Sequence, residues 1–121
     1  MISAGEQKVA SYLQQRGIEY KSQFSCETLR TCNNGFYKFD FAILGQNHSP
    51  IGMIEFNGKQ HYISSDFFGA VEEIQTRDNN KIEWCKACNI PLLIIPYYFT
   101  DNEIYSALEQ FIKEVAGGEQ E

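Results

Sequence analysis

The chain lacks any apolar run long enough to cross a membrane, and its first residues lack the charged-then-apolar layout of a signal peptide. It also lacks internal repeats, low-complexity segments and linker-like stretches. A chain of 121 residues is a common length for one domain, so we expect a single domain over residues 1–121 and no membrane partner. These absences favour a cytoplasmic protein.

The sequence contains no run of lysine and arginine, and its formal net charge of −6 gives no indication of a nucleic-acid-binding protein. The charge is unevenly distributed. Residues 101–121 hold six acids and one base, or −5, whereas residues 1–100 hold ten acids and nine bases, or −1. Four of those ten acids belong to the site derived below, so a bound cation would leave the remainder mildly positive. The net charge therefore neither excludes nor indicates DNA.

The chain has four cysteines, and disulfides are rare in the cytoplasm. The pairs Cys26-x5-Cys32 and Cys85-x2-Cys88 leave two alternatives open. The four thiolates could hold a structural Zn²⁺ ion, although the first gap is longer than the roughly two to four residues usual in such sites. Alternatively, Cys85 is an ordinary small hydrophobic residue, because it belongs to an apolar helical stripe.

Hydrophobic periodicity predicts an α/β chain with elements in the order αβββαβα. A capping pattern, Ser3-x-x-Glu6, opens the first helix, which should stop near Gly17. Alternating or nearly all-apolar stretches predict four strands, at 18–24, 36–44, 51–56 and 91–99. Residues 26–35 separate the first two strands as an irregular link that ends in a turn signal, Asn33-Asn34-Gly35.

Helical patterns cover residues 69–89 and the C-terminal part of the chain. The second of these helices should begin at a capping pattern, Thr100-x-x-Glu103, and stop at Gly117-Gly118. The third strand, the long helix and the fourth strand should form a right-handed parallel crossover. We therefore expect a mixed four-stranded sheet flanked by helices.

The second and third strands should form a β-hairpin with residues 45–50 as its loop. If Leu44 faces Ile51, paired residue numbers sum to 95, and Asp40 lies directly opposite Glu55 with Cβ atoms ~5 Å apart. Like charges in such a pair repel each other unless a positive charge lies between them, and a hard divalent cation held by the two carboxylates, a backbone carbonyl and waters is the natural candidate. A register shifted by one residue is the alternative, because it would place the two acids on opposite faces.

The long helix carries an acid inside its apolar stripe. Asp78 is the member needed to complete a helical series of otherwise apolar residues, Val71, Ile74, Ile82 and Cys85. A carboxylate in a core-facing stripe is costly unless it is paired or coordinated. Asp78 therefore either joins a site with the hairpin acids or bonds a loop backbone or Lys81, one turn further along.

These residues and six stretches that span most of the chain resemble the PD-(D/E)XK nuclease superfamily. The stretches are GEQKVASYL, GIEYKSQF, KFDFAIL, IEFNGKQHY, QTRDNNK and IPLLIIPYY. Within the superfamily, the chain is similar to small phage and bacterial proteins related to very-short-patch repair endonucleases, and to homing endonucleases described by an E-D-x-H-D pattern. The resemblance implies a restriction-endonuclease-like αβββαβ core, here with an extra C-terminal helix, and a bacterial or phage-infected host cell.

The resemblance also implies roles for individual residues. Asp40 and Glu55, with the Phe56 carbonyl, would hold Mg²⁺ or Mn²⁺. The further catalytic positions that it implies are Glu6, Gln60, His61, Asp78 and Lys81. His61 or a lysine would take a proton from water or stabilise charge on phosphate, and Asp78 would orient His61 or Lys81. Taken singly, Gln60 and His61 are equally consistent with ordinary loop surface, and Glu6 with helix capping.

One position departs from the pattern of the superfamily. Asn57 stands where typical members have Lys and many of these relatives have Asp, and Asn supplies neither charge. Lys38, Lys59 and Lys81 are the candidates to replace it. The expected function is a metal-dependent DNA endonuclease, active as a homodimer or with a partner protein that targets it. The alternative is a catalytically weakened protein of the same fold that binds nucleic acid or another protein.

Overall fold

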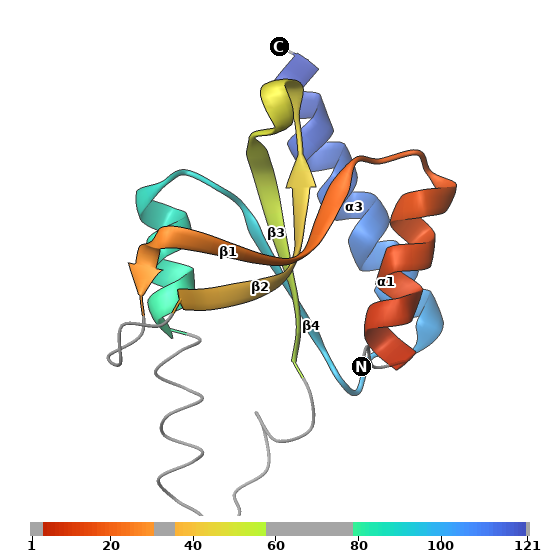
Figure 1. Cartoon of the computed structure of the whole chain (residues 1–121). Coiled ribbons are helices and arrows are strands. Elements are labelled where there is room, and N and C mark those ends of the chain that lie inside the picture. The colour runs from red at the N-terminus through yellow and green to blue at the C-terminus, as the bar shows by residue number, and fades with distance from the viewer. Residues whose placement is uncertain (1–3, 31–35, 58–78, 121) are drawn as a thin grey trace, which may run out of the picture.

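The structure is a computed structural model that describes residues 4–30, 36–57 and 79–120. It is an α/β arrangement built on a four-stranded mixed sheet in the order β1-β2-β3-β4, as expected from the sequence (Figure 1). The elements are α1 (Ala4–Gln15), β1 (Tyr20–Arg30), β2 (Phe36–Leu44), the short 3₁₀ turn η1 (Gln46–His48), β3 (Pro50–Asn57), β4 (Leu92–Pro96) and α3 (Asp101–Gln120). The pairs β1–β2 and β2–β3 are antiparallel, whereas β3–β4 is parallel.

A further helix, whose described residues are 79–87, lies between β3 and β4 in the chain, and we call it the crossover helix. It packs on one face of the sheet, while α1 and α3 pack on the other (Figure 1). The parallel pairing it connects runs from Met53↔Leu92 to Asn57↔Pro96. The predicted strand–helix–strand crossover is therefore present.

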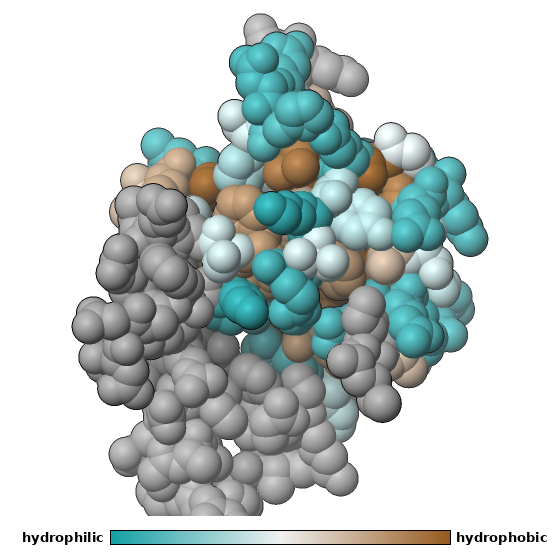
Figure 2. Space-filling view, in the orientation of Figure 1, coloured by the Kyte–Doolittle hydropathy of each residue, from teal (hydrophilic) through white to brown (hydrophobic). Residues whose placement is uncertain are grey.

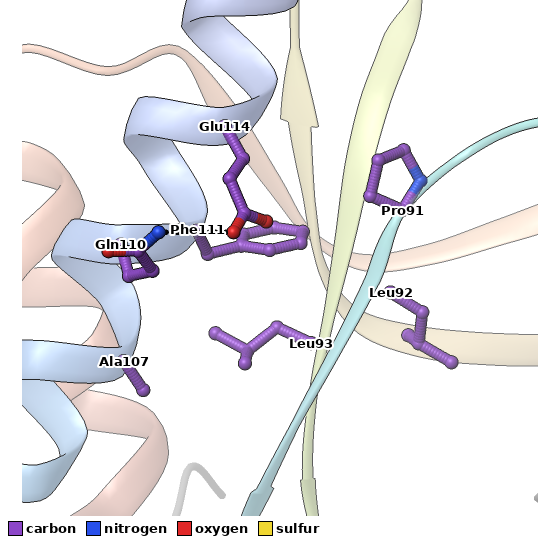
Figure 3. A pocket seen from close by; sticks show the side chains of 7 residues that line it. All are labelled: Pro91, Leu92, Leu93, Ala107, Gln110, Phe111 and Glu114. Carbon is purple, nitrogen blue, oxygen red and sulfur yellow. Dashed lines mark hydrogen bonds between the residues drawn. The ribbon is translucent and has the colours of Figure 1, made fainter.

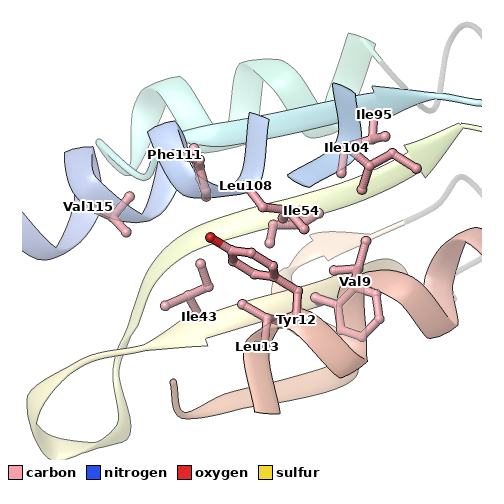
Figure 4. Packing of buried hydrophobic residues seen from close by; sticks show 11 residues of the cluster. Val9, Tyr12, Leu13, Ile43, Ile54, Ile95, Ile104, Leu108, Phe111 and Val115 are labelled. Carbon is pink, nitrogen blue, oxygen red and sulfur yellow. The ribbon is translucent and has the colours of Figure 1, made fainter. Parts of the chain in front are cut away.

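The face under α1 and α3 forms an apolar core (Figure 4). Val9 and Leu13 lie one turn apart on α1, and Leu108 faces them from α3; all three are completely buried. The buried members of this cluster are Val9, Tyr12, Leu13, Phe41, Ile43, Ile54, Ile95, Ile104, Leu108, Phe111 and Val115. The apolar stripe predicted for the last helix thus points into the core. Its packing is close, because a Cβ added at Gly52 would lie 3.0 Å from the Phe111 ring.

The face under the crossover helix has a smaller apolar cluster made of Phe39, Ala42, Met53 and Cys85. Trp84 adds an aromatic contact, because the centroid of its ring lies 5.7 Å from that of the Phe39 ring. Among the side chains that the structure describes, two polar residues are buried in the sheet, Glu55 at 7% exposed and Asn57 at 6%. Both belong to β3, where side chains alternate with Ile54 and Phe56, which pack on the opposite side with α1 and α3.

Two helices end with the same backbone motif. Gly17, with φ +67, follows α1, and Ile18 N–H donates to the Leu13 carbonyl. Asn89, with φ 58, follows the crossover helix, and Ile90 N–H donates to the Cys85 carbonyl. In each case a left-handed residue turns the chain and its successor satisfies a carbonyl of the last helical turn, which is a Schellman motif.

The second predicted capping pattern is confirmed. Thr100 N–H donates to Glu103 Oε1 at 2.8 Å, and Glu103 N–H donates to Thr100 Oγ1 at 3.2 Å. These reciprocal bonds satisfy N–H groups that the first turn of α3 cannot use within the helix. The first pattern depends on Ser3, which lies outside the described residues, although α1 does begin at Ala4.

Several predicted boundaries were wrong. Residues 26–30 are not an irregular link but part of β1, which stays paired with β2 beyond a register shift between Ser25 and Arg30. β4 ends at Pro96 instead of Phe99. α3 continues through Gly117-Gly118 to Gln120; glycine in a helix costs about 1 kcal/mol per residue but does not force an end.

Among the described residues seen in Figure 2, hydrophilic ones lie mostly around the rim, and hydrophobic ones emerge between them toward the centre. Among the described residues, no helix combines the length and the apolar character that crossing a membrane requires.

Candidate metal centre

Asp40 and Glu55 meet on one face of the sheet, as the hairpin register predicted. The β2–β3 ladder pairs Phe41 with Ile54, and the sum of 95 holds along the pairs up to Ile43↔Gly52. Asp40 N–H donates to Glu55 Oε1 at 2.9 Å, and Phe56 N–H donates to Asp40 Oδ2 at 2.7 Å. The alternative register is excluded. The prediction erred only at the loop, where a register shift pairs Leu44 with Pro50 instead of Ile51.

The two carboxylates lie where the sheet divides. Beyond Phe41 and Ile54, β2 remains paired with β1, and β3 remains paired with β4. In Figure 1, β1 and β2 curve to one side while β3 and β4 run downward. We call this divergence the fork. Each carboxylate accepts a hydrogen bond from a backbone N–H of the opposite strand. Where the β2–β3 ladder ends, these side chains therefore replace backbone carbonyls as the acceptors.

A bend in the β1–β2 pair accompanies the fork. Gln23, opposite Asp40 between the pairs Ser22↔Phe41 and Phe24↔Phe39, has φ 52, in the left-handed region. On one side of this level Phe41 packs under α1 and α3, whereas on the other side Phe39 packs under the crossover helix. Strict alternation would put both rings on one face. At the level of Asp40 the β1–β2 pair is therefore rotated, so that Phe39 faces the crossover helix although Phe41, two residues further along, faces α1 and α3.

Lys81 of the crossover helix completes the buried polar cluster. Its Nζ donates to Glu55 Oε2 at 3.1 Å, and the two side chains are only 13% and 9% exposed. The ammonium also lies 5.5 Å from the centre of the Phe39 ring, within cation–π distance. The sequence suggested that Lys81 could pair with Asp78; in the structure, it forms an ion pair with Glu55.

Burial raises the pKa of Glu55 to about 7, because few solvent dipoles stabilise its charge. The Lys81 ammonium opposes this rise, and the negative charge of Asp40 adds to it. One ammonium therefore does not offset both the desolvation of Glu55 and the repulsion between two carboxylates. A second cation beside Asp40 and Glu55 would lower the free energy of the charged pair.

The donors at the fork suit a hard divalent cation. Mg²⁺ commonly binds one or two carboxylates and completes its shell with waters and substrate phosphate oxygens. Phe56 N–H points to β2, and the two backbone groups of a strand residue face the same neighbour, so the Phe56 carbonyl faces β2 as well. Two carboxylates and one carbonyl fit Mg²⁺ or Mn²⁺. Among the described residues, no three His, Cys, Asp or Glu side chains form a metal-binding group.

Glu6 lies in the first turn of α1, which the close contact of its neighbour Gly5 places against the end of β3. A Cβ added at Gly5 would lie 2.3 Å from the Phe56 ring, so only glycine allows this approach. This contact is with the Phe56 ring on the α1/α3 face, opposite the face that carries Glu55, so the role assigned to Glu6 remains a prediction. Gln60, His61 and Asp78 lie outside the described residues, and their assigned roles remain predictions.

The three lysines considered as replacements for Asn57 have different positions. Lys38 is exposed and pairs with Ser25 of β1, because β2 has separated from β3 at that level, so it does not lie opposite Asn57 as continuing the hairpin register would require. Lys59 lies outside the described residues. Lys81 is the lysine that the structure places at Glu55.

The structure favours the alternative for Cys85, that of an ordinary small hydrophobic residue. Cys85 is 2% exposed within the cluster that contains Phe39 and Met53, and burial raises the pKa of its thiol to about 11. Cys88 is exposed, and both are free thiols. A thiol that resists deprotonation packs as a small hydrophobic residue. Cys32 and the side chain of Cys26 lie outside the description, so the zinc site stays a prediction.

Sequence reasoning missed the bend and the positions that shape it. Gln23 and Phe39 carry no special pattern, and glutamine is not a residue that favours a positive φ. The ion pair between Glu55 and Lys81 joins residues 26 positions apart. Its only signal was that both residues had been assigned to one site by resemblance.

Comparisons with protein-family models, with curated proteins and with solved structures found no match to this chain.

Proposed function

We propose that this chain is a divalent-metal-dependent endonuclease that hydrolyses phosphodiester bonds in DNA. The observation that carries the proposal is the fork, where the Asp40 and Glu55 carboxylates each accept a hydrogen bond from a backbone N–H of the opposite strand and Lys81 Nζ lies 3.1 Å from Glu55 Oε2. Buried like charges with an adjacent cationic side chain are typical of sites that bind metal and phosphate. The resemblance to PD-(D/E)XK nucleases supports the same chemistry.

Each residue of the fork has a physical task in this mechanism. Asp40, Glu55 and the Phe56 carbonyl would hold Mg²⁺ or Mn²⁺, which when bound polarises a phosphate and makes a bound water more acidic. The bond from Phe56 N–H fixes the orientation of the Asp40 carboxylate. The Lys81 ammonium can stabilise the negative charge that builds on the phosphate, and its burial strengthens that interaction. His61, where the resemblance applies, would accept the proton of the attacking water.

A second candidate is a binding protein on the same scaffold that cuts nothing. Glu55 already has a cationic partner in Lys81, and Asn57 supplies no charge at the position where related nucleases carry Lys or Asp. Such a protein would bind DNA or another protein without a divalent ion. Metal binding therefore separates the two candidates.

The test measures nicking of supercoiled, single-stranded and branched DNA with Mg²⁺ or Mn²⁺. We expect Asp40→Asn and Glu55→Gln each to lower the rate by about 100-fold or more, since each removes a charged ligand. Lys81→Met should also lower it, whereas Lys86→Met, at an exposed position of the same helix, should leave it unchanged. Nicking that survives both carboxylate substitutions, or that never appears, contradicts the proposal.

Calorimetry with Mn²⁺ provides the second readout. Wild-type protein should bind the ion, and Asp40→Asn should bind it weakly or not at all. Metal binding without nicking of any DNA form would support a protein that keeps the ion site but lacks catalysis. Absence of both would favour the binding protein.

A further inference from the structure

A groove between β4 and α3 forms a second candidate site, separate from the fork and independent of the proposed nuclease activity. It has a volume of about 520 Å³. Its lining residues are Pro91, Leu92, Leu93, Ala107, Gln110, Phe111 and Glu114. We propose that this groove binds an extended, positively charged segment of a partner protein, with an apolar side chain and a lysine or arginine two residues apart.

The groove offers an apolar floor and one charged group. Leu93 lies between β4 and α3, with Ala107 and Phe111 on the helix beside it, and the Glu114 carboxylate lies near the Phe111 ring (Figure 3). Gln110 Nε2 donates to Glu114 Oε1 at 3.2 Å, which holds the carboxylate at this position. Of the seven lining residues only Glu114 carries a charge. An occupant that fills the floor and neutralises Glu114 is therefore both apolar and cationic.

The position beside β4 favours an extended segment. β4 is the last strand of the sheet in the part of the chain that the structure describes. Met53 N–H donates to the Pro91 carbonyl at 2.9 Å, and by the alternation of a parallel ladder Leu92 and Ile94 direct their backbone groups away from β3. A strand added there would place every second side chain over the groove, so that its residues i and i+2 reach the floor and Glu114.

Charge favours a basic segment of a partner protein over two other possible occupants, a nucleic acid and a second copy of this chain. Over the described side chains of α3, residues 101–116, four acids and one base give a net −3, and that base, Lys113, pairs with Glu109 at 3.5 Å and so does not offset Glu114. A nucleic acid would bring phosphate against this acidic helix. A second copy would bring its own Glu114 and a further net charge of −6. Only a basic segment is complementary to both the groove and its surroundings.

The test titrates the ¹⁵N-labelled full chain with an acetylated heptapeptide, Thr-Val-Thr-Lys-Thr-Ile-Thr, and with a matched peptide that has Glu in place of Lys. The lysine peptide should shift the amide signals of Leu93, Ile94, Ala107 and Phe111. It should bind about threefold to fivefold more tightly than the glutamate peptide, as expected for one partly exposed charge pair. Glu114→Lys should reverse this preference.

Two variants separate the groove from general charge effects. Glu83→Lys makes the same change in net charge at an exposed position of the crossover helix and should leave the preference unchanged. Ala107→Phe fills the groove and should lower the affinity for both peptides while the melting temperature stays near that of the wild type. Failure of the lysine peptide to bind overturns the proposal, as does equal binding of both peptides or an equal effect of Glu83→Lys. A DNA oligonucleotide or self-association that shifts the same signals also overturns it, since the occupant would then be another molecule.

Discussion

The two faces of the sheet differ in what their buried residues do. Under α1 and α3, the buried residues are apolar and tightly packed around Ile54 and Leu108. Under the crossover helix, apolar residues such as Met53 and Cys85 share the interior with the charged pair Glu55–Lys81. Neighbouring residues of the same strand, Ile54 and Glu55, belong to the two different environments. The comparison teaches that both faces gain stability from apolar packing, whereas only the face under the crossover helix also buries charged groups whose desolvation costs free energy.

Shortening a core side chain should have the largest effect. Leu108→Ala removes a completely buried side chain from the α1/α3 face and should lower the free energy of unfolding by about 3 to 5 kcal/mol, because it leaves a cavity. Urea denaturation measures this loss, which should be similar at pH 5 and pH 8. Ser106→Ala, at an exposed position of the same helix, is the control and should change stability little. An equally small loss in Leu108→Ala would show that this face is loosely packed.

The opposite face should respond to pH. The pKa of Glu55 is raised to about 7 in the folded protein from 4.5, so the folded state holds the proton more tightly than the unfolded state. Its contribution to stability is complete below about pH 4.5 and is lost as pH rises through 7. Between pH 4 and pH 8 the wild type should therefore lose about 3 kcal/mol of unfolding free energy that Glu55→Gln, which has no carboxyl group at this position, does not lose.

Parallel urea denaturation series for wild type and Glu55→Gln, from pH 4 to pH 8, provide the measurement. Comparing their slopes cancels the contributions of other groups that titrate. Identical slopes for the two proteins would mean that Glu55 is not desolvated in the folded state.

A divalent ion should restore stability at the fork. Mn²⁺ at about a hundredfold excess over its dissociation constant should stabilise the wild-type protein by about 2.7 kcal/mol. The gain should shrink below the pKa of Glu55, since a protonated carboxyl is a poor ligand. Thermal denaturation with and without Mn²⁺ at pH 5 and pH 8 tests this, and Asp40→Asn should show no gain. A gain that persists in this variant would place the ion elsewhere.

The left-handed residues in the Schellman motifs that end α1 and the crossover helix allow a test with a smaller expected effect on stability. Gly17→Ala, at φ +67, should cost about 1 kcal/mol from backbone strain alone, because a Cβ at this position would meet nothing within 4 Å. Asn89→Gly, at φ 58, should instead gain a few tenths of a kcal/mol up to about 1. Denaturation curves of the two variants check both signs. A stabilising Gly17→Ala would mean that the left-handed turn is not kept in solution.

Local patterns predicted several features of the fold correctly. The Thr100–Glu103 capping box, the amphipathic stripe of α3 and the hairpin register around Phe41↔Ile54 all follow from residues close together in the chain. Boundaries failed where pairing with a neighbour overrode local composition. β1 extends to Arg30 because β2 offers it hydrogen-bond partners, although the sequence there resembles an irregular link.

The candidate site was predicted in part. The meeting of Asp40 and Glu55 followed from the arithmetic of the hairpin, because two strands joined by a short loop have a fixed register. The role of Lys81 as the partner of Glu55 did not, because the distance between a helix and a strand far apart in the chain depends on how the whole crossover packs.

The sequence by itself determined the order of the elements, the mixed sheet and the pairing of two acids across one hairpin, since periodicity, caps and loop length act over a few residues. Only the tertiary structure decided that the sheet divides at Asp40, that the strand pair β1–β2 turns over at Gln23, and that Lys81 reaches Glu55. These outcomes depend on how twisted strands and helices share one interior. Many distant contacts settle that arrangement together, and no short stretch of the chain encodes it.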